Sequence, residues 1–117
     1  NIIFAGGYYY KNLQLFQSPE GIRMIRRIRA TKAFISASGV SQKLGVTCVE
    51  QIEVDTKQAA ISSSLNKILV FDSSKLDKIG PSYFAQLTDF DAIITDSNIP
   101  EDWIEYLKTT DIKLYTV

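Results

Sequence analysis

The residues with the clearest chemical potential are Asp72-Ser73-Ser74-Lys75, which directly follow the apolar run Ile68–Phe71. A short run rich in β-branched residues predicts a buried parallel strand. In open α/β sheets, ligands bind outside the carboxyl ends of such strands. A carboxylate, two hydroxyls and an ammonium at that edge suit a small polyol that carries a phosphate. Taken alone, these residues support an ordinary turn with a solvated lysine about equally well.

Three other segments end in the same kind of residues: Gly6-Gly7, Ser38-Gly39 and 95–98, which reads Thr-Asp-Ser-Asn. Glycine permits close backbone approach, and free N–H groups and hydroxyls suit an anionic, hydroxyl-rich ligand. The carboxyl ends of parallel strands share one edge of a sheet. We therefore expect all four segments to line one bowl.

Strand and helix patterns alternate along the chain, which predicts an α/β fold with a mainly parallel sheet flanked by helices. Strands are expected over 2–5, 33–37, 68–71, 91–94 and 112–117, and helices over 18–30, 50–63, 82–87 and from Pro100 onward. Segment 8–16 is expected to be irregular or briefly extended, and a loop is expected through Gly45 and Thr47. Expected inward side chains are Val54, Ile61, Leu65, Tyr83, Phe84, Leu87, Trp103, Ile104 and Leu107.

The composition excludes several classes of protein. The chain has 117 residues, a single domain or part of one, with 45% hydrophobic residues and no histidine. Its 13 basic and 13 acidic side chains cancel, which is unlike a nucleic-acid-binding domain. One cysteine, Cys48, supports neither a disulfide framework nor a metal cluster. We expect no metal, no cofactor, no membrane segment and a cytoplasmic location. The chain opens on an apolar run without an initiator methionine, which suggests truncation at the N-terminus.

Two charged features leave alternatives open. Arg23, Arg26 and Arg27 share one face of the first expected helix, either as an anion or DNA contact or, as the neutral chain favours, as a solvated or subunit-facing surface. Glu53 and Lys57 have the spacing of a surface ion pair. Equally, Lys57 can point toward the bowl and help to hold a phosphate. No nucleophile elbow, Walker loop or G-x-G-x-x-G pattern is present, so we assign no catalytic residue.

The ordered segments 32–40 (KAFISASGV), 45–47, 53–57, 72–75 (DSSK) and 90–96 (FDAIITD) resemble the C-terminal sensor domain of DeoR-type bacterial transcription regulators. The resemblance implies a ribose-5-phosphate isomerase-like, Rossmann-like fold that binds a phosphorylated sugar or a related metabolite. It also implies a DNA-binding helix-turn-helix domain upstream, and a first phosphate-binding loop before Asn1. The strands missing with that loop would leave sheet edges open.

The resemblance to the isomerase also implies a test for enzyme activity. Its general-base glutamate, counted back from Lys75, corresponds to Lys57, and its acidic loop corresponds to 36–40, which has no carboxylate. Isomerisation through an enediol needs a positioned base. A sensor derived from an enzyme therefore fits better than the alternative, a sugar-phosphate isomerase. A third possibility is an assembly module with a vestigial bowl.

We therefore predict an effector-binding and oligomerisation domain of a DeoR-type repressor that meets DNA only through a domain outside these residues. In this hypothesis Lys75 and Lys57 supply charge to a phosphate and Asp72 accepts hydroxyls. Backbone N–H groups come from Gly6, Gly7, Ser38 and Gly39.

Overall fold

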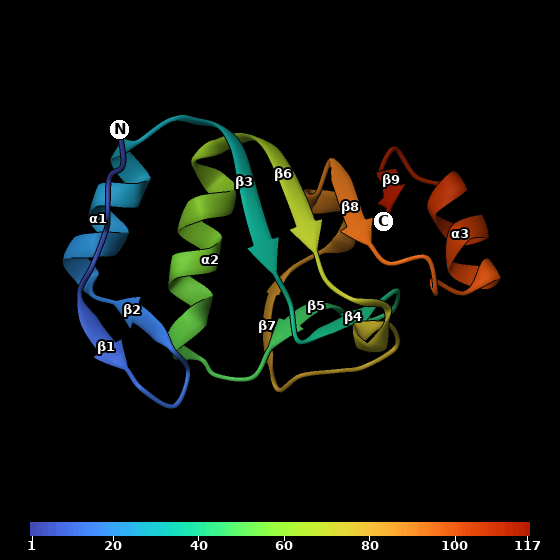
Figure 1. Ribbon diagram of the computed structural model, residues 1–117, viewed down its shortest axis with the longest axis horizontal. Coiled ribbons are helices and arrows are strands. Elements are labelled where there is room, and N and C mark those ends of the chain that lie inside the picture. The colour runs from blue at the N-terminus through green and yellow to red at the C-terminus, as the bar shows by residue number, and fades with distance from the viewer.

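A four-stranded parallel sheet forms the centre of the molecule. The computed structural model describes all residues 1–117, and the sheet has the order β3-β6-β8-β9 (Figure 1). The strands are β3 (Ala30–Ser36), β6 (Ser64–Val70), β8 (Ala92–Thr95) and β9 (Lys113–Thr116). The fold is therefore α/β and Rossmann-like, as the alternating pattern predicts, and β3 and β9 are its two edge strands.

One face of this sheet carries the core. Alternate residues along the strands, such as Ile35, Leu69 and Ile93, are buried in one cluster with Val54 of α2 (Ile52–Ser62) and Trp103 of α3 (Glu101–Lys108). On the second face Phe34 is 64% exposed and Tyr115 is 53% exposed. No helix covers that face, although parallel sheets are usually covered on both.

The inward residues were predicted correctly in the main, with two exceptions. Val54, Phe84, Leu87, Trp103 and Leu107 are buried, and Ile61 and Ile104 pack against the core as partly buried residues. Leu65 is 72% exposed because α2 ends at Ser62 and Leu65 lies in β6. Tyr83 is half exposed because residues 82–85 form a strand rather than a helix.

A second sheet, antiparallel, lies toward the carboxyl ends of β3 and β6 (Figure 1). It consists of β4 (Gly39–Ser41), β5 (Gly45–Cys48) and β7 (Ser82–Ala85), in that order. The predicted helix over 82–87 is therefore wrong, and so is the predicted loop through Gly45 and Thr47. Pairing with β5 draws residues 82–85 into a strand, followed by the short 3-10 helix Leu87–Asp89, and in a strand Tyr83 and Phe84 point to opposite faces.

The N-terminal segment also differs from the prediction. Residues 2–5 form no strand, because no neighbouring strand offers hydrogen bonds to their backbone, and Ile2 is 95% exposed. The strands here are instead β1 (Tyr8–Tyr10) and β2 (Leu15–Gln17), which pair as a hairpin. Phe4 packs edge-on against Phe16, with ring centroids 5.0 Å apart.

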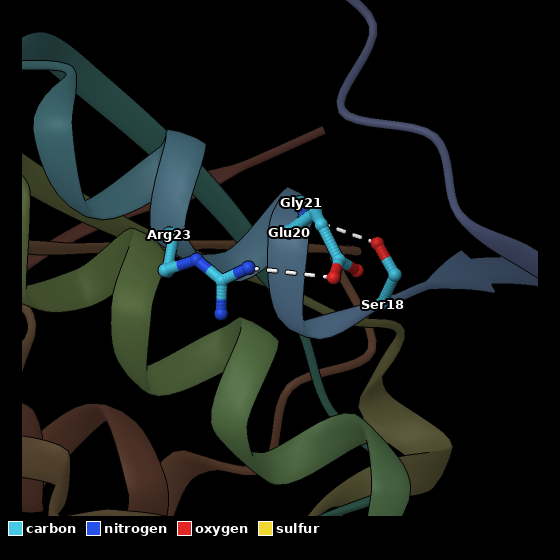
Figure 2. Close-up of polar contacts among 4 residues, drawn as sticks. All are labelled: Ser18, Glu20, Gly21 and Arg23. Atoms are coloured by element: carbon cyan, nitrogen blue, oxygen red, sulfur yellow. Dashed lines mark hydrogen bonds and ion pairs between the residues drawn. The ribbon is translucent and has the colours of Figure 1, made fainter.

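Helix α1 (Pro19–Arg27) begins where the sequence predicts. The Ser18 hydroxyl accepts a hydrogen bond from the Gly21 amide at 3.0 Å, and Glu20 pairs with Arg23 at 3.3 Å (Figure 2). Pro19 occupies the first turn, where a missing N–H costs nothing. Arg23, Arg26 and Arg27 are exposed, as expected of a solvated face. Figure 1 shows α1 and the hairpin at one end of the molecule and α3 at the other.

Candidate functional site

Three of the four predicted segments lie at one edge of the parallel sheet. The register pairs Ser36 with Val70 and Val70 with Ile94, so β3, β6 and β8 end side by side. Segments 38–39, 72–75 and 95–98 follow these ends. Three of the four segments that were predicted to line the bowl therefore do lie at one sheet edge.

Two carboxylates order the loop after β6, and one of them, Asp96, joins it to the loop after β8. Asp72 caps the short 3-10 helix Ser73–Lys75, accepting from the Ser74 hydroxyl and, at 3.0 Å, from the Ser74 amide. Asp96 accepts the Ser73 amide at 2.7 Å. These hydrogen bonds lower the pKa of both groups: for Asp72 the Ser74 hydroxyl contributes most, and for Asp96 the Ser73 amide does. Both carboxylates are thus held ionised at the strand ends.

Lys75 ends that 3-10 helix, and its ammonium group has neither an ion pair nor a hydrogen bond. Its charge contributes to lowering the pKa of Asp72, which places the two groups within electrostatic reach of one another. Lys75 is therefore a cation available to a ligand at this edge.

Lys57 reaches the same edge from α2. Its Nζ donates to the Ser36 carbonyl oxygen at 2.8 Å and to the Ser36 hydroxyl at 3.2 Å. It also lies 5.2 Å from the centroid of the Phe84 ring. Burial lowers the pKa of Lys57, and the nearby Glu53 charge partly offsets this effect. Of the two sequence interpretations, the one in which Lys57 points toward the bowl agrees with this geometry, since no ion pair joins it to Glu53.

Ser38 and Gly39 lie next to the loop after β6, because Val40 bridges to Leu76 and its carbonyl accepts the Asp77 amide at 2.8 Å. The Ser38 amide already donates to the Thr47 carbonyl oxygen at 2.9 Å, so it is not free in this conformation. A side chain on Gly39 would collide with the Lys78 carbonyl oxygen, which explains the glycine structurally.

Gly6 and Gly7 are not part of this edge, which corrects the fourth member of the predicted bowl. They follow no strand, and Gly7, at φ +115°, packs on the backbone of Gln17. The physical reason is that residues 2–5 lack a neighbouring strand that would carry the two glycines to the sheet edge.

A cleft beside Lys57 contains residues that were not predicted to bind a ligand. Its walls are the hairpin turn, Ser36 and three residues of α2: Glu53, Thr56 and Lys57. From the sequence, Glu53 was expected only as a possible ion-pair partner of Lys57, and no sequence pattern pointed to Thr56 as a ligand-binding residue. Their position depends on how the hairpin folds over α2, which no local pattern reveals.

No group of three or more His, Cys, Asp or Glu side chains is placed to hold a metal ion. None of the helices has the length and apolar character needed to cross a membrane.

Comparison with known proteins decides the family. The family model described as the DeoR C-terminal sensor domain matches residues 1–97. The chain belongs to this family. This DeoR-type sensor domain is 38% identical over 97 residues to a lactose phosphotransferase system repressor of Staphylococcus epidermidis, a match that spans 83% of the chain and 38% of that repressor.

Two more relatives are also transcriptional regulators. A deoxyribose operon repressor of Escherichia coli K12 is 29% identical over 110 residues, 94% of the chain and 44% of the repressor. An HTH-type transcriptional regulator of Haemophilus influenzae is 30% identical over 117 residues, all of the chain and 45% of the regulator. The sensor domain thus spans less than half the length of these curated relatives, and its relatives are transcriptional regulators.

Proposed function

We propose that this DeoR-type sensor domain binds a phosphorylated sugar and passes the binding event to a DNA-binding domain elsewhere in the same protein. The observation that carries the proposal is the pair of lysines at one sheet edge. Lys57 is held at the last residue of β3, and Lys75 lies in the loop that follows the neighbouring strand β6. Two cations at adjacent strand ends match the charge of a phosphate dianion.

The polar groups around the lysines suit the sugar part of such a ligand. Asp72 is ionised and exposed, so its oxygens can accept hydroxyl protons in addition to the Ser74 hydrogen bonds. The names of the relatives are consistent with this class of ligand, since two are repressors of sugar-related systems, the deoxyribose operon and a lactose phosphotransferase system.

In this proposal, ligand binding shifts the balance between conformations or oligomeric states of the complete protein and thereby changes its affinity for DNA. The complete protein is a homo-oligomeric repressor whose helix-turn-helix domain lies outside these residues. Such a helix-turn-helix is the expected source of DNA contact because the sensor domain itself is electrically neutral.

Calorimetry on the complete protein with a panel of sugar phosphates at fixed ionic strength tests the proposal. Replacing Lys75 by alanine removes a charge-assisted contact of roughly 1.5–3 kcal/mol, so affinity should fall about ten- to a hundredfold. Lys108→Ala, which removes the same charge from exposed α3, should leave affinity unchanged. Unaltered affinity of a folded Lys75→Ala variant would remove Lys75 from the site. Equal binding of the unphosphorylated sugar would contradict the phosphate assignment.

The same proposal excludes isomerase activity. Lys57 occupies the position that corresponds to the isomerase base, and a lysine acts as a base only after losing its proton. Burial lowers its pKa in the free protein, but a bound phosphate dianion raises it again. We expect no solvent-deuterium exchange at the sugar C2 above the rate in buffer. Exchange that a Lys57 or Lys75 substitution abolishes would favour the enzyme instead.

A further inference from the structure

The cleft between the β1–β2 hairpin and the start of α2 continues the proposed effector site. Ser36, Glu53 and Lys57 line this cleft. The cleft therefore opens at the carboxyl end of β3, where Lys57 is hydrogen-bonded to Ser36. The hairpin turn closes the other side of the cleft. Whatever ligand reaches Lys57 therefore meets the groups of this cleft.

Hydrogen-bonding capacity in the cleft is incompletely used. The Lys57 ammonium has three N–H groups, and the structure gives it two acceptors, both on Ser36. On Glu53, Oε2 accepts the Glu50 amide at 3.3 Å, and Oε1 has no partner. The Thr56 hydroxyl oxygen is buried and also has none. Buried polar atoms of this kind are rare in proteins unless a water molecule or a ligand satisfies them.

The arrangement fits hydroxyl groups rather than a second phosphate. Glu53 and Lys57 are one helical turn apart, so a free acceptor and a free donor lie next to each other on α2. A sugar hydroxyl donates one hydrogen bond and accepts others. The Glu53 carboxylate repels a phosphate group, which leaves the hairpin end of the cleft to uncharged hydroxyls.

We propose that Glu53 is a specificity-determining residue that accepts a hydrogen bond from a hydroxyl of the bound sugar phosphate. The ligand then lies with its phosphate toward the loop after β6 and its hydroxyls toward the hairpin. This inference rests on the proposed function and adds to it the orientation of the ligand and the group that distinguishes a sugar phosphate from phosphate alone.

The test is calorimetry on the complete protein with inorganic phosphate and two pairs of sugar phosphates: ribose 5-phosphate and glucose 6-phosphate, each with its 2-deoxy counterpart. Glu53→Gln keeps an oxygen for the Glu50 amide but removes the charge. For the sugar phosphate that the wild type binds best, affinity should fall about tenfold, because a hydrogen bond to a charged acceptor is lost. Binding of inorganic phosphate should stay within twofold.

Asp55→Asn is the matched control, since Asp55 carries the same charge on the same helix but is exposed and outside the cleft. Its affinities should equal those of the wild type. If Glu53→Gln proves unfolded, Glu53→Asp, which keeps the charge and shortens the side chain, should produce the same selective loss.

The outcomes separate the two proposals. A wild type that binds no sugar phosphate overturns the proposed function, and this inference with it. A wild type that binds one, combined with a folded Glu53 variant of unchanged affinity, overturns this inference alone. An equal loss for inorganic phosphate would also overturn it, because Glu53 would then act on the charge of Lys57 rather than on a hydroxyl.

Discussion

The Thr47 hydroxyl joins three backbone segments next to the candidate site, and its removal should destabilise the protein measurably. Thr47 is 3% exposed. Its Oγ1 donates to the Gly39 carbonyl oxygen at 3.3 Å and accepts the Gly80 amide at 2.7 Å. Thr47→Val preserves the shape of the side chain and deletes both hydrogen bonds.

The expected cost follows from these two bonds. Each contributes about 1 kcal/mol net, and a buried donor left without a partner costs more than the bond itself. Gly80 loses its acceptor in a partly buried loop, so we expect the free energy of unfolding to fall by about 2 kcal/mol.

Thr95 offers a matched control for the same chemical change. It is 2% exposed, it ends β8 at the same sheet edge, and its Oγ1 has no hydrogen-bond partner. Thr95→Val removes a buried, unsatisfied hydroxyl, so it should leave stability unchanged or raise it by about 1 kcal/mol. The two threonine-to-valine variants should thus differ by roughly 2–3 kcal/mol.

Denaturant unfolding of the complete protein, followed through the fluorescence of Trp103, measures both variants. Trp103 is the only tryptophan of these 117 residues and is fully buried. The denaturant midpoint of Thr47→Val should lie below that of the wild type. The midpoint of Thr95→Val should equal or exceed the wild-type value. Equal midpoints for the two variants would refute the reasoning, because burial would then outweigh hydrogen bonding as the cause.

Two other changes test the fold and the site. Ser18→Ala removes the hydrogen bond to the Gly21 amide and should cost about 1 kcal/mol in denaturant unfolding, whereas Ser18→Asp should retain the cap; a cost for both would contradict a capping role. The pKa of Lys57 is lower in the folded than in the unfolded state. Between the folded and unfolded pKa values the unfolded chain therefore binds more protons than the folded chain. The free energy of unfolding should rise with pH in this window, which ends near the ordinary lysine pKa. Lys57→Met should abolish that rise in unfolding measured from pH 8 to 11, and a rise that persists in the variant would assign it to other groups.

The parallel sheet could be predicted because its signals are local. The runs Ile68–Phe71 and 91–94 are apolar, end in polar residues and alternate with helical patterns, so strand type and shared edge follow directly. The same local signals place Asp72 and Lys75 in the loop after β6, whereas the sequence left the direction of Lys57 open between a surface ion pair and the bowl. The sheet and the positions of Asp72 and Lys75 need only the order of the elements.

The incorrect predictions, a helix over 82–87 and a strand over 2–5, share a different physical cause. Residues 82–85 become a strand because β5 pairs with them, and 2–5 remain unpaired because no strand lies beside them. Both outcomes depend on whether a partner strand from elsewhere in the sequence is present, and this condition outweighs the local pattern. Glu53 became a candidate for the same reason, since the hairpin that completes its cleft forms 36 or more residues earlier in the chain, at Tyr8–Gln17.

The parallel topology also has a consequence for folding kinetics. Within the small sheet, Gly39 meets Thr47 after a short turn, but in the large sheet Ser36 meets Val70 and Ile68 meets Ala92 only after whole intervening elements. The loop-closure entropy of these distant pairings is lost before their contacts stabilise the chain, which makes such sheets slow to form. The strand ends that position Lys57, Asp72 and Lys75 are fixed only by those pairings. A partly folded chain therefore has its antiparallel turn before it has the edge at which a ligand is expected.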